Sequence, residues 1–169
     1  SLGSAQRIKN AALLVDENSS TMVVLSAMSG ITNTLSDAYS DILNASFTES
    51  ILKIDAVNNH FNETAYQLFD DKAFLSLALN EIKAAIDEIK NKKELIRQKE
   101  LLSYGELITS RLFSIYLASI GRKNTLLSAF DFMALTENGE PNMNFISSRL
   151  ASLMPQTNEN TLYITQGFI

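Results

Sequence analysis

Cysteine is absent from the 169-residue sequence, and histidine occurs only once. Without cysteine the chain has no disulfide, no zinc–thiolate site and no thiol nucleophile. The single histidine, His60, lies in a polar stretch, where we expect a solvated position on a helix. One imidazole does not make a metal cluster, so the sequence predicts no metal site.

Basic clusters and long apolar runs are also missing. The formal net charge is −5, from 14 basic and 19 acidic residues, and no Lys/Arg-rich run stands out, so nucleic acid is not expected as a partner. No apolar run approaches the roughly 20 residues that span a bilayer, and no signal-peptide pattern opens the chain. We therefore expect a cytoplasmic protein without a membrane partner.

The residues that are present suit a single folded domain. Hydrophobic residues make up 46% of the chain and charged residues 20%, which is ordinary for a globular protein with a real core. Neither an internal repeat nor a low-complexity segment is evident.

The most informative stretch is an apolar run, residues 22–25, that ends in small and hydroxylated residues. Four apolar residues in a row are typical of a strand covered on both faces. Ser26 and Gly30 follow, and Thr32 or Asn33 is a plausible N-cap for a helix. Such a strand–loop–helix junction binds anionic ligands in many α/β sheets, although turn and cap chemistry alone also favours these residue types.

Apolar periodicity predicts helices and strands in alternation, which favours an α/β fold with a mainly parallel sheet and helices on both faces. We expect a break at 101–105 and turns at 131–144 and 155–160. The expected helices cover about 5–15, 32–45, 50–100 (as a helical hairpin), 107–120 and 145–153, and the expected strands cover 21–25, 125–127 and 162–165.

The second half of the hairpin has heptad-like apolar spacing, which suggests either a coiled-coil partner helix or a hairpin packed on its own domain. The repeat is too short for a free coiled coil, so we favour the hairpin. The spaced residues are Leu75, Leu79, Ile82, Ile86 and Ile89.

A second notable group is residues 102–107, LSYGEL. Ser103 and Glu106 fit the S-x-x-E capping box, which is a sufficient structural reason for both residues. Alternatively, Glu106 lies in the first turn of a helix, faces the same crevice as Thr32 and holds the ammonium of an amino acid. Spacing alone favours the cap.

Several segments resemble aspartate kinases of the amino-acid-kinase superfamily. Residues 24–33, VLSAMSGITN, are similar to the family's VLSAMSG-T-N segment, and residues 103–110, SYGELITS, to its S-x-GE-L-S motif. Residues 1–5, SLGSA, resemble the end of KFGGTS-V-G-S-A, and residues 163–169, YITQGFI, resemble the ITQGFI strand. These blocks occur in the family's order and cover essentially the whole chain.

The resemblance implies a three-layer amino-acid-kinase-like fold and ATP-dependent phosphorylation of the L-aspartate side-chain carboxylate, giving 4-phospho-L-aspartate. That reaction belongs to the biosynthesis of lysine, threonine and methionine. By the resemblance, Thr32 and Glu106 bind aspartate, Ser26 lies on the same loop, and Ser1 and Gly3 lie on the nucleotide side. The expected partners are L-aspartate and ATP with Mg²⁺, and the parent enzyme is expected to be a homo-oligomer.

The family's KFGG lysine and its GRGGSD segment do not occur in the sequence, nor do regulatory ACT domains. Phosphoryl transfer depends on charge neutralisation around the phosphates. We therefore expect residues 1–169 to be the N-terminal, amino-acid-binding part of an aspartate kinase catalytic domain, truncated, inactive when isolated and without a catalytic residue of its own.

Three other functions are compatible with parts of the sequence. A glutamate or N-acetylglutamate kinase is a relative within the superfamily, but residues 103–110 argue against it. A non-catalytic interaction domain would use the hairpin at 50–100 as its docking surface. A dinucleotide-binding oxidoreductase is weaker, because no G-x-G-x-x-G follows a strand.

Overall fold

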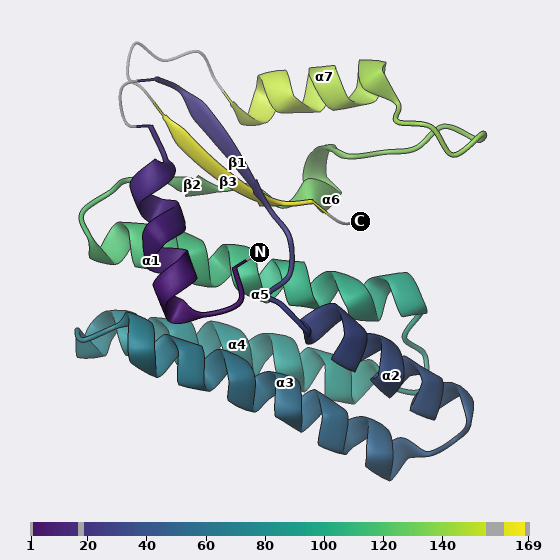
Figure 1. The fold of residues 1–169 in the computed structure, drawn as a ribbon. Helices are drawn as coiled ribbons and strands as arrows, with labels where there is room; N and C mark the ends of the chain where they lie inside the picture. The colour runs from purple at the N-terminus through teal and green to yellow at the C-terminus, as the bar shows by residue number, and fades with distance from the viewer. Residues whose placement is uncertain (1, 17–18, 155–160, 168–169) are drawn as a thin grey trace.

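The computed structural model describes residues 2–16, 19–154 and 161–167, which form a helix-rich α/β fold with a small parallel sheet (Figure 1). The predicted turn at 155–160 lies outside these residues. None of the described helices is long and apolar enough to cross a membrane. The elements are α1 (Ala5–Leu14), β1 (Thr21–Leu25), α2 (Ile31–Leu43), α3 (Phe47–Leu68), α4 (Lys72–Lys92), α5 (Gln98–Ser119), β2 (Thr125–Leu126), α6 (Ala129–Phe132), α7 (Met143–Leu153) and β3 (Leu162–Gln166).

The sheet has the order β1-β3-β2, and both pairings are parallel, as the alternation of strands and helices predicts. Central strand β3 is buried along its whole length because helices cover both of its faces. Leu162 and Ile164 join the larger core with α1 and α5, whereas Tyr163 packs in a smaller core with Phe132 of α6 and Ile146 of α7. Figure 1 shows α7 on one side of the sheet and α5 on the other.

Helices α3 and α4 form the predicted hairpin, which packs against α2 and α5 on the side away from the sheet (Figure 1). The heptad-like residues Ile82, Ile86 and Ile89 are buried in the domain's own core. Phe61 of α3 is fully buried in the same core. This burial confirms the hairpin over a free coiled-coil strand.

The predicted break at 101–105 is wrong, because α5 runs without interruption from Gln98 to Ser119. Ser103 lies inside this helix, and its hydroxyl donates to the Glu100 carbonyl oxygen at 2.7 Å. The capping box of Ser103 and Glu106 is therefore wrong as well, since Glu106 lies well beyond the first turn. The glycine at 105 suggested a break, but it serves a close helix contact described below.

The predicted N-cap of α2 is also wrong. Gly30 is the N-cap, with a left-handed φ of 84°, and the helix begins at Ile31. A positive φ is easy for glycine and strained for most other residues. Thr32 is therefore a residue of the first helical turn rather than the cap.

His60 does not occupy the solvated position predicted for it. Its side chain is half-buried on α3, and its ring meets Phe61 edge-on with centroids 6.2 Å apart. The polar sequence around His60 hid this burial, because α3 packs against helices on several sides.

Candidate functional site

The loop at residues 26–30 joins β1 to α2 at the carboxyl end of the sheet, as the sequence predicts. Ala27 and Met28 are buried, whereas Ser26, Ser29 and Gly30 are exposed. The loop closes through the Ile31 amide, which donates to the Met28 carbonyl oxygen at 3.1 Å. Its apolar residues thus hold it to the domain, and its hydroxyl-bearing residues lie at the surface.

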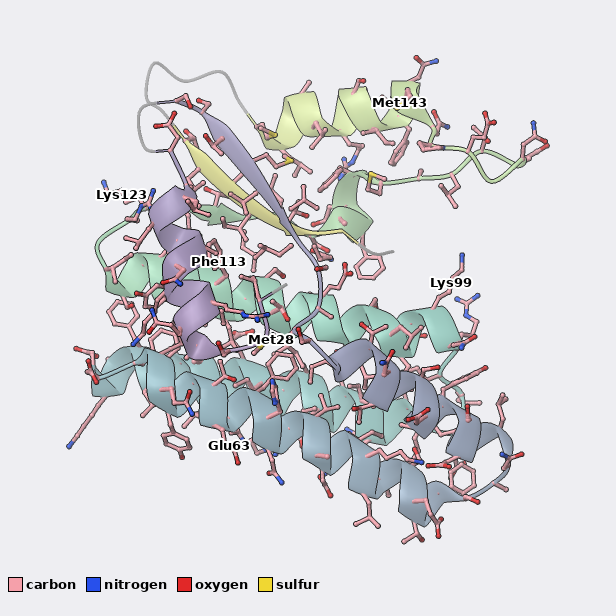
Figure 2. The ribbon with its side chains drawn as sticks, in the orientation of Figure 1. Met28, Glu63, Lys99, Phe113, Lys123 and Met143 are labelled. Carbon is pink, nitrogen blue, oxygen red and sulfur yellow. The ribbon has the colours of Figure 1, made fainter. Side chains whose placement is uncertain are left out.

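Thr109 of α5 holds this loop by a hydrogen bond. The Met28 backbone N–H donates to Thr109 Oγ1 at 3.2 Å, in a buried hydrogen bond. The same hydroxyl donates to the Gly105 carbonyl oxygen at 2.7 Å. One buried threonine therefore joins the loop to α5, and Figure 2 shows Met28 beside that helix.

Gly105 allows α5 to approach the loop and α2 very closely. A Cβ atom at Gly105 would lie 3.0 Å from Ala27 Cβ and 3.0 Å from Ile31 Cγ2. A side chain at this position would therefore crowd Ala27 and Ile31, which would have to give way. This contact, rather than a helix break, explains a glycine at this position.

Glu106, the next residue, lies at the carboxyl ends of β1 and β3. Its Oε2 atom is 3.6 Å from the place that a Cβ on Gly167 would occupy. Gly167 follows β3, and its N–H donates to the Leu25 carbonyl oxygen at 3.0 Å, so it holds the ends of the two strands together. The half-buried Glu106 carboxylate thus stands at the sheet edge where α/β proteins bind ligands.

Thr32 and Ser26, the other two predicted substrate residues, are exposed at the same end of the sheet. Ser26 directly follows β1, and Thr32 follows Ile31, which touches the Gly105 position. The first turn of α2 and the middle of α5 therefore meet near the carboxyl ends of the strands, next to the predicted site residues. That Thr32 and Glu106 converge on one ligand stays a prediction.

Of the two residues predicted for the nucleotide side, Ser1 lies outside the described residues. Gly3 lies against the loop at 26–30, because a Cβ at Gly3 would be only 2.7 Å from Ser29 Oγ. The segment before α1 is therefore packed onto the same loop as Ser26.

A groove of about 940 Å³ lies along the first half of α5, and neither Ser26, Thr32 nor Glu106 lines it. Its wall includes an ion pair, Lys92 to Glu88 at 2.6 Å. The Lys92 hydrogen bond holds the pKa of Glu88 below its ordinary value, and burial raises the pKa of Tyr104 to about 12. Figure 2 shows Lys99, another wall residue, at the start of α5.

No metal centre was predicted, and within residues 2–16, 19–154 and 161–167 no three His, Cys, Asp or Glu side chains gather closely enough to hold a metal ion.

Sequence reasoning missed Thr109 and misread Gly105. Both belong to the stretch that resembles an aspartate-kinase motif, and they are spaced by one helical turn. That spacing indicates one continuous helix on which a threonine hydroxyl reaches the carbonyl four residues earlier, a signal that the S-x-x-E pattern obscured.

Comparison with protein-family models gives no match. Among curated proteins, aspartokinase 2 and aspartokinase 3 of Arabidopsis thaliana, both named chloroplastic, are each 28% identical to the chain over its whole length. The chain is therefore similar to aspartokinases over its whole length. It spans about a third of the length of the curated relatives it matches, 33% for aspartokinase 2 and 32% for aspartokinase 3.

The chain is also similar to aspartokinases among solved structures. Escherichia coli aspartokinase III in complex with aspartate and ADP (R-state) is 26% identical, with a TM-score of 0.83, over 99% of this chain and 38% of that one. The same enzyme with lysine and aspartate (T-state) has a TM-score of 0.82 at 26% identity, over 99% and 39%. Clostridium acetobutylicum aspartate kinase shares the fold, with a TM-score of 0.73 at 15% identity, over 96% and 36%.

Proposed function

We propose that residues 1–169 form the amino-acid-binding part of an aspartate kinase catalytic domain, with a three-layer amino-acid-kinase-like fold and α3–α4 as a helical insertion. The protein that carries this chain would use ATP with Mg²⁺ to phosphorylate the side-chain carboxylate of L-aspartate. The product, 4-phospho-L-aspartate, would enter the biosynthesis of lysine, threonine and methionine. We expect the complete enzyme to be a homo-oligomer.

The observation that carries this proposal is the position of Glu106. Its carboxylate lies beside Gly167 at the carboxyl ends of β1 and β3. The hydroxyl-bearing loop at 26–30 leads into α2, and both the loop and α2 contact α5 at Gly105, the residue before Glu106. A zwitterionic amino acid needs an acceptor for its ammonium and donors for its carboxylates. A carboxylate facing a hydroxyl-rich loop offers both.

In this proposal Glu106 accepts hydrogen bonds from the substrate ammonium, Thr32 donates its hydroxyl to a substrate carboxylate, and Ser26 offers a second hydroxyl. A substrate carboxylate oxygen would form the new bond to the γ-phosphorus of ATP, and the bond from that phosphorus to the bridging oxygen would break, releasing ADP. The residues of this chain would hold the amino acid in line for attack.

Gly3 would lie on the nucleotide side of the site, since its segment packs against the loop at 26–30. Mg²⁺ would be expected with ATP. The described residues offer no cluster of metal ligands, so we assign no Mg²⁺ ligand to this chain and derive no step through the metal.

Glutamate and N-acetylglutamate kinases remain less favoured than aspartate kinases, because the similarity of sequence and fold points to aspartokinases. A helical docking domain is also less favoured, because the apolar stripe of α4 is buried inside the domain.

The substitution Glu106→Gln tests the proposal in the complete enzyme. It keeps the side-chain shape and removes the charge. Because Glu106 lies in the middle of α5 and is not a helix cap, the substitution removes no capping hydrogen bond, and a thermal melt run alongside measures any effect on folding. Loss of a charge-assisted hydrogen bond, on the order of 1.5–3 kcal/mol, should lower kcat/KM for aspartate about ten- to a hundredfold.

Steady-state kinetics with aspartate and ATP varied separately measure this effect, and KM for ATP should move much less. Glu137→Gln is the matched control, because Glu137 is an exposed glutamate in the turn before α7. Unchanged aspartate kinetics in the Glu106 variant would remove the proposed role.

A further inference from the structure

Gln166, the last residue of central strand β3, carries a buried side-chain amide without a hydrogen-bond partner. Its side chain is only 3% exposed, and its Nε2 atom is buried with no acceptor among the described residues. The amide nitrogen carries two N–H donors. Folded proteins pair nearly all such groups, so an unpaired one requires an explanation.

The strand geometry places this amide beside the candidate site. Side chains alternate along β3, so Gln166 shares the face of Ile164, which packs in the core with α5. Its register partner Leu25 is buried in the same core. The next residue, Gly167, is the one that the Glu106 carboxylate approaches.

Resting on the proposed function, we propose that Gln166 is a positioning residue for Glu106. When substrate is bound, an N–H of the Gln166 amide donates to one oxygen of the Glu106 carboxylate, while the other oxygen receives the substrate ammonium. A carboxylate has about four lone-pair sites, so it can accept both at once. Gln166 Nε2 is too deeply buried to touch the ligand itself, and it therefore acts through Glu106.

A purely structural role for Gln166 predicts something different. A structural amide makes its hydrogen bonds within the folded protein, and this amide makes none with the described residues. Replacing it by an apolar side chain of similar shape should leave stability unchanged or raise it, since an unpaired buried donor is unfavourable. The amide is thus expected to matter for ligand binding rather than for folding.

The experiment is a double-mutant cycle in the complete enzyme with Gln166→Met, Glu106→Gln and the double variant. We expect Gln166→Met to raise KM for aspartate about three- to tenfold, the size of one neutral hydrogen bond, with KM for ATP unchanged and the melting temperature equal or higher. In the Glu106→Gln background, Gln166→Met should add no further loss, because its effect passes through Glu106.

Ser50→Ala is the matched control. The Ser50 hydroxyl is also fully buried without a partner, but it lies in α3, which packs against other helices away from the sheet. This variant should also keep or raise the melting temperature, and its aspartate kinetics should equal those of the unmodified enzyme. If Gln166→Met gives too little folded enzyme, Gln166→Leu replaces it in the cycle.

Unchanged KM for aspartate in Gln166→Met would overturn the inference, and so would an undiminished effect in the Glu106→Gln background. If Glu106→Gln impairs aspartate use while the Gln166 variants do not, only this inference fails. An unmodified enzyme without aspartate-dependent ATP turnover would overturn both the proposed function and the inference.

Discussion

The helical pair α3–α4 and the carboxyl edge of the sheet are held by different kinds of contact. The helical pair depends on large apolar side chains, such as the fully buried Phe61 and Ile82. The sheet edge depends on a close backbone approach at Gly105 and on the buried hydrogen bonds of Thr109. Apolar packing thus stabilises the helical pair, whereas close backbone contacts and buried hydrogen bonds stabilise the sheet edge.

Charges also differ between the two regions. In the helical pair the charged side chains lie near the surface. Lys90 and Asp55, for example, form an ion pair at 2.5 Å in which the two side chains are 34% and 41% exposed. Such pairs add little stability. At the sheet edge, Glu106 stands half-buried between strand ends. The comparison suggests that substitutions in the helices act on stability, whereas substitutions at the edge also act on ligand binding.

The largest expected effect lies in the helical pair. Phe61→Ala should lower the free energy of unfolding by about 3–5 kcal/mol, because it leaves a cavity in a fully packed core. Denaturant unfolding measures the loss. Tyr66→Ala on the same helix removes an aromatic ring that is 63% exposed, so its effect should be far smaller.

The comparison requires that the folded fraction of the Phe61→Ala enzyme keeps its KM for aspartate. A large rise in that KM, at a temperature where the variant is fully folded, would show that the helical pair and the sheet edge are not separate.

The next effect sharpens the comparison at the sheet edge. Thr109→Val keeps the side-chain volume but removes the acceptor of the buried Met28 N–H. An unpaired buried N–H should lower the free energy of unfolding by about 1–3 kcal/mol. Because Met28 lies in the loop with Ser26, KM for aspartate should also rise.

Thr64→Val is the matched control in the helical pair. Thr64 is also a buried helical threonine, and its hydroxyl donates to the His60 carbonyl oxygen at 2.9 Å. Among the described residues, it accepts no hydrogen bond from another element. Its loss should be smaller and should leave aspartate kinetics unchanged. Equal kinetic effects of the two variants would contradict a special role for Thr109.

The sequence allowed most of the fold to be predicted, because periodicity reports which faces are buried. The strand at 21–25, the spaced residues of α4 and the strand near Ile164 all lie where the pattern places them. The expectation that the run at 22–25 is covered on both faces is wrong, because β1 is an edge strand of the sheet and leaves Val24 59% exposed. The residues of the predicted site, Thr32 and Glu106, came from resemblance, since spacing alone favoured a cap for Glu106.

The rest depends on contacts between distant segments, which a local pattern does not report. Gly105 signals a break by its propensity, and only the approach of Ala27 shows why a glycine stands inside a helix. The polar neighbours of His60 predict exposure, and only the packing of α3 shows that its ring is half-buried. The unpaired amide of Gln166 has no signal in sequence at all.

The smallest expected effect concerns the charged cluster where α4 meets the first half of α5. Burial, followed by the hydrogen bond with Glu88, raises the pKa of Tyr104 from 10.0 to about 12. A raised pKa in the folded state gives stability that is fully present below pH 10 and is lost as the pH rises toward 12. One pKa unit corresponds to about 1.4 kcal/mol, and allowing for solvent in the adjoining groove we expect about 1 kcal/mol from the phenol. Lys92, whose pKa is raised chiefly by its hydrogen bond to Glu88, loses its own contribution to stability in the same alkaline range, so the Tyr104 contribution must be isolated by comparing two variants.

The stability advantage of the unmodified protein over Tyr104→Phe should therefore shrink by about 1 kcal/mol between pH 10 and 12, as followed by urea unfolding. Phenolate absorbance should show the same residue titrating late, and Glu88→Gln should bring that titration to lower pH, because it removes the carboxylate that raises the pKa of Tyr104. A stability difference that stays constant across this pH range would mean that Tyr104 titrates alike in the folded and unfolded protein, and that this margin of the helical pair contributes through packing alone.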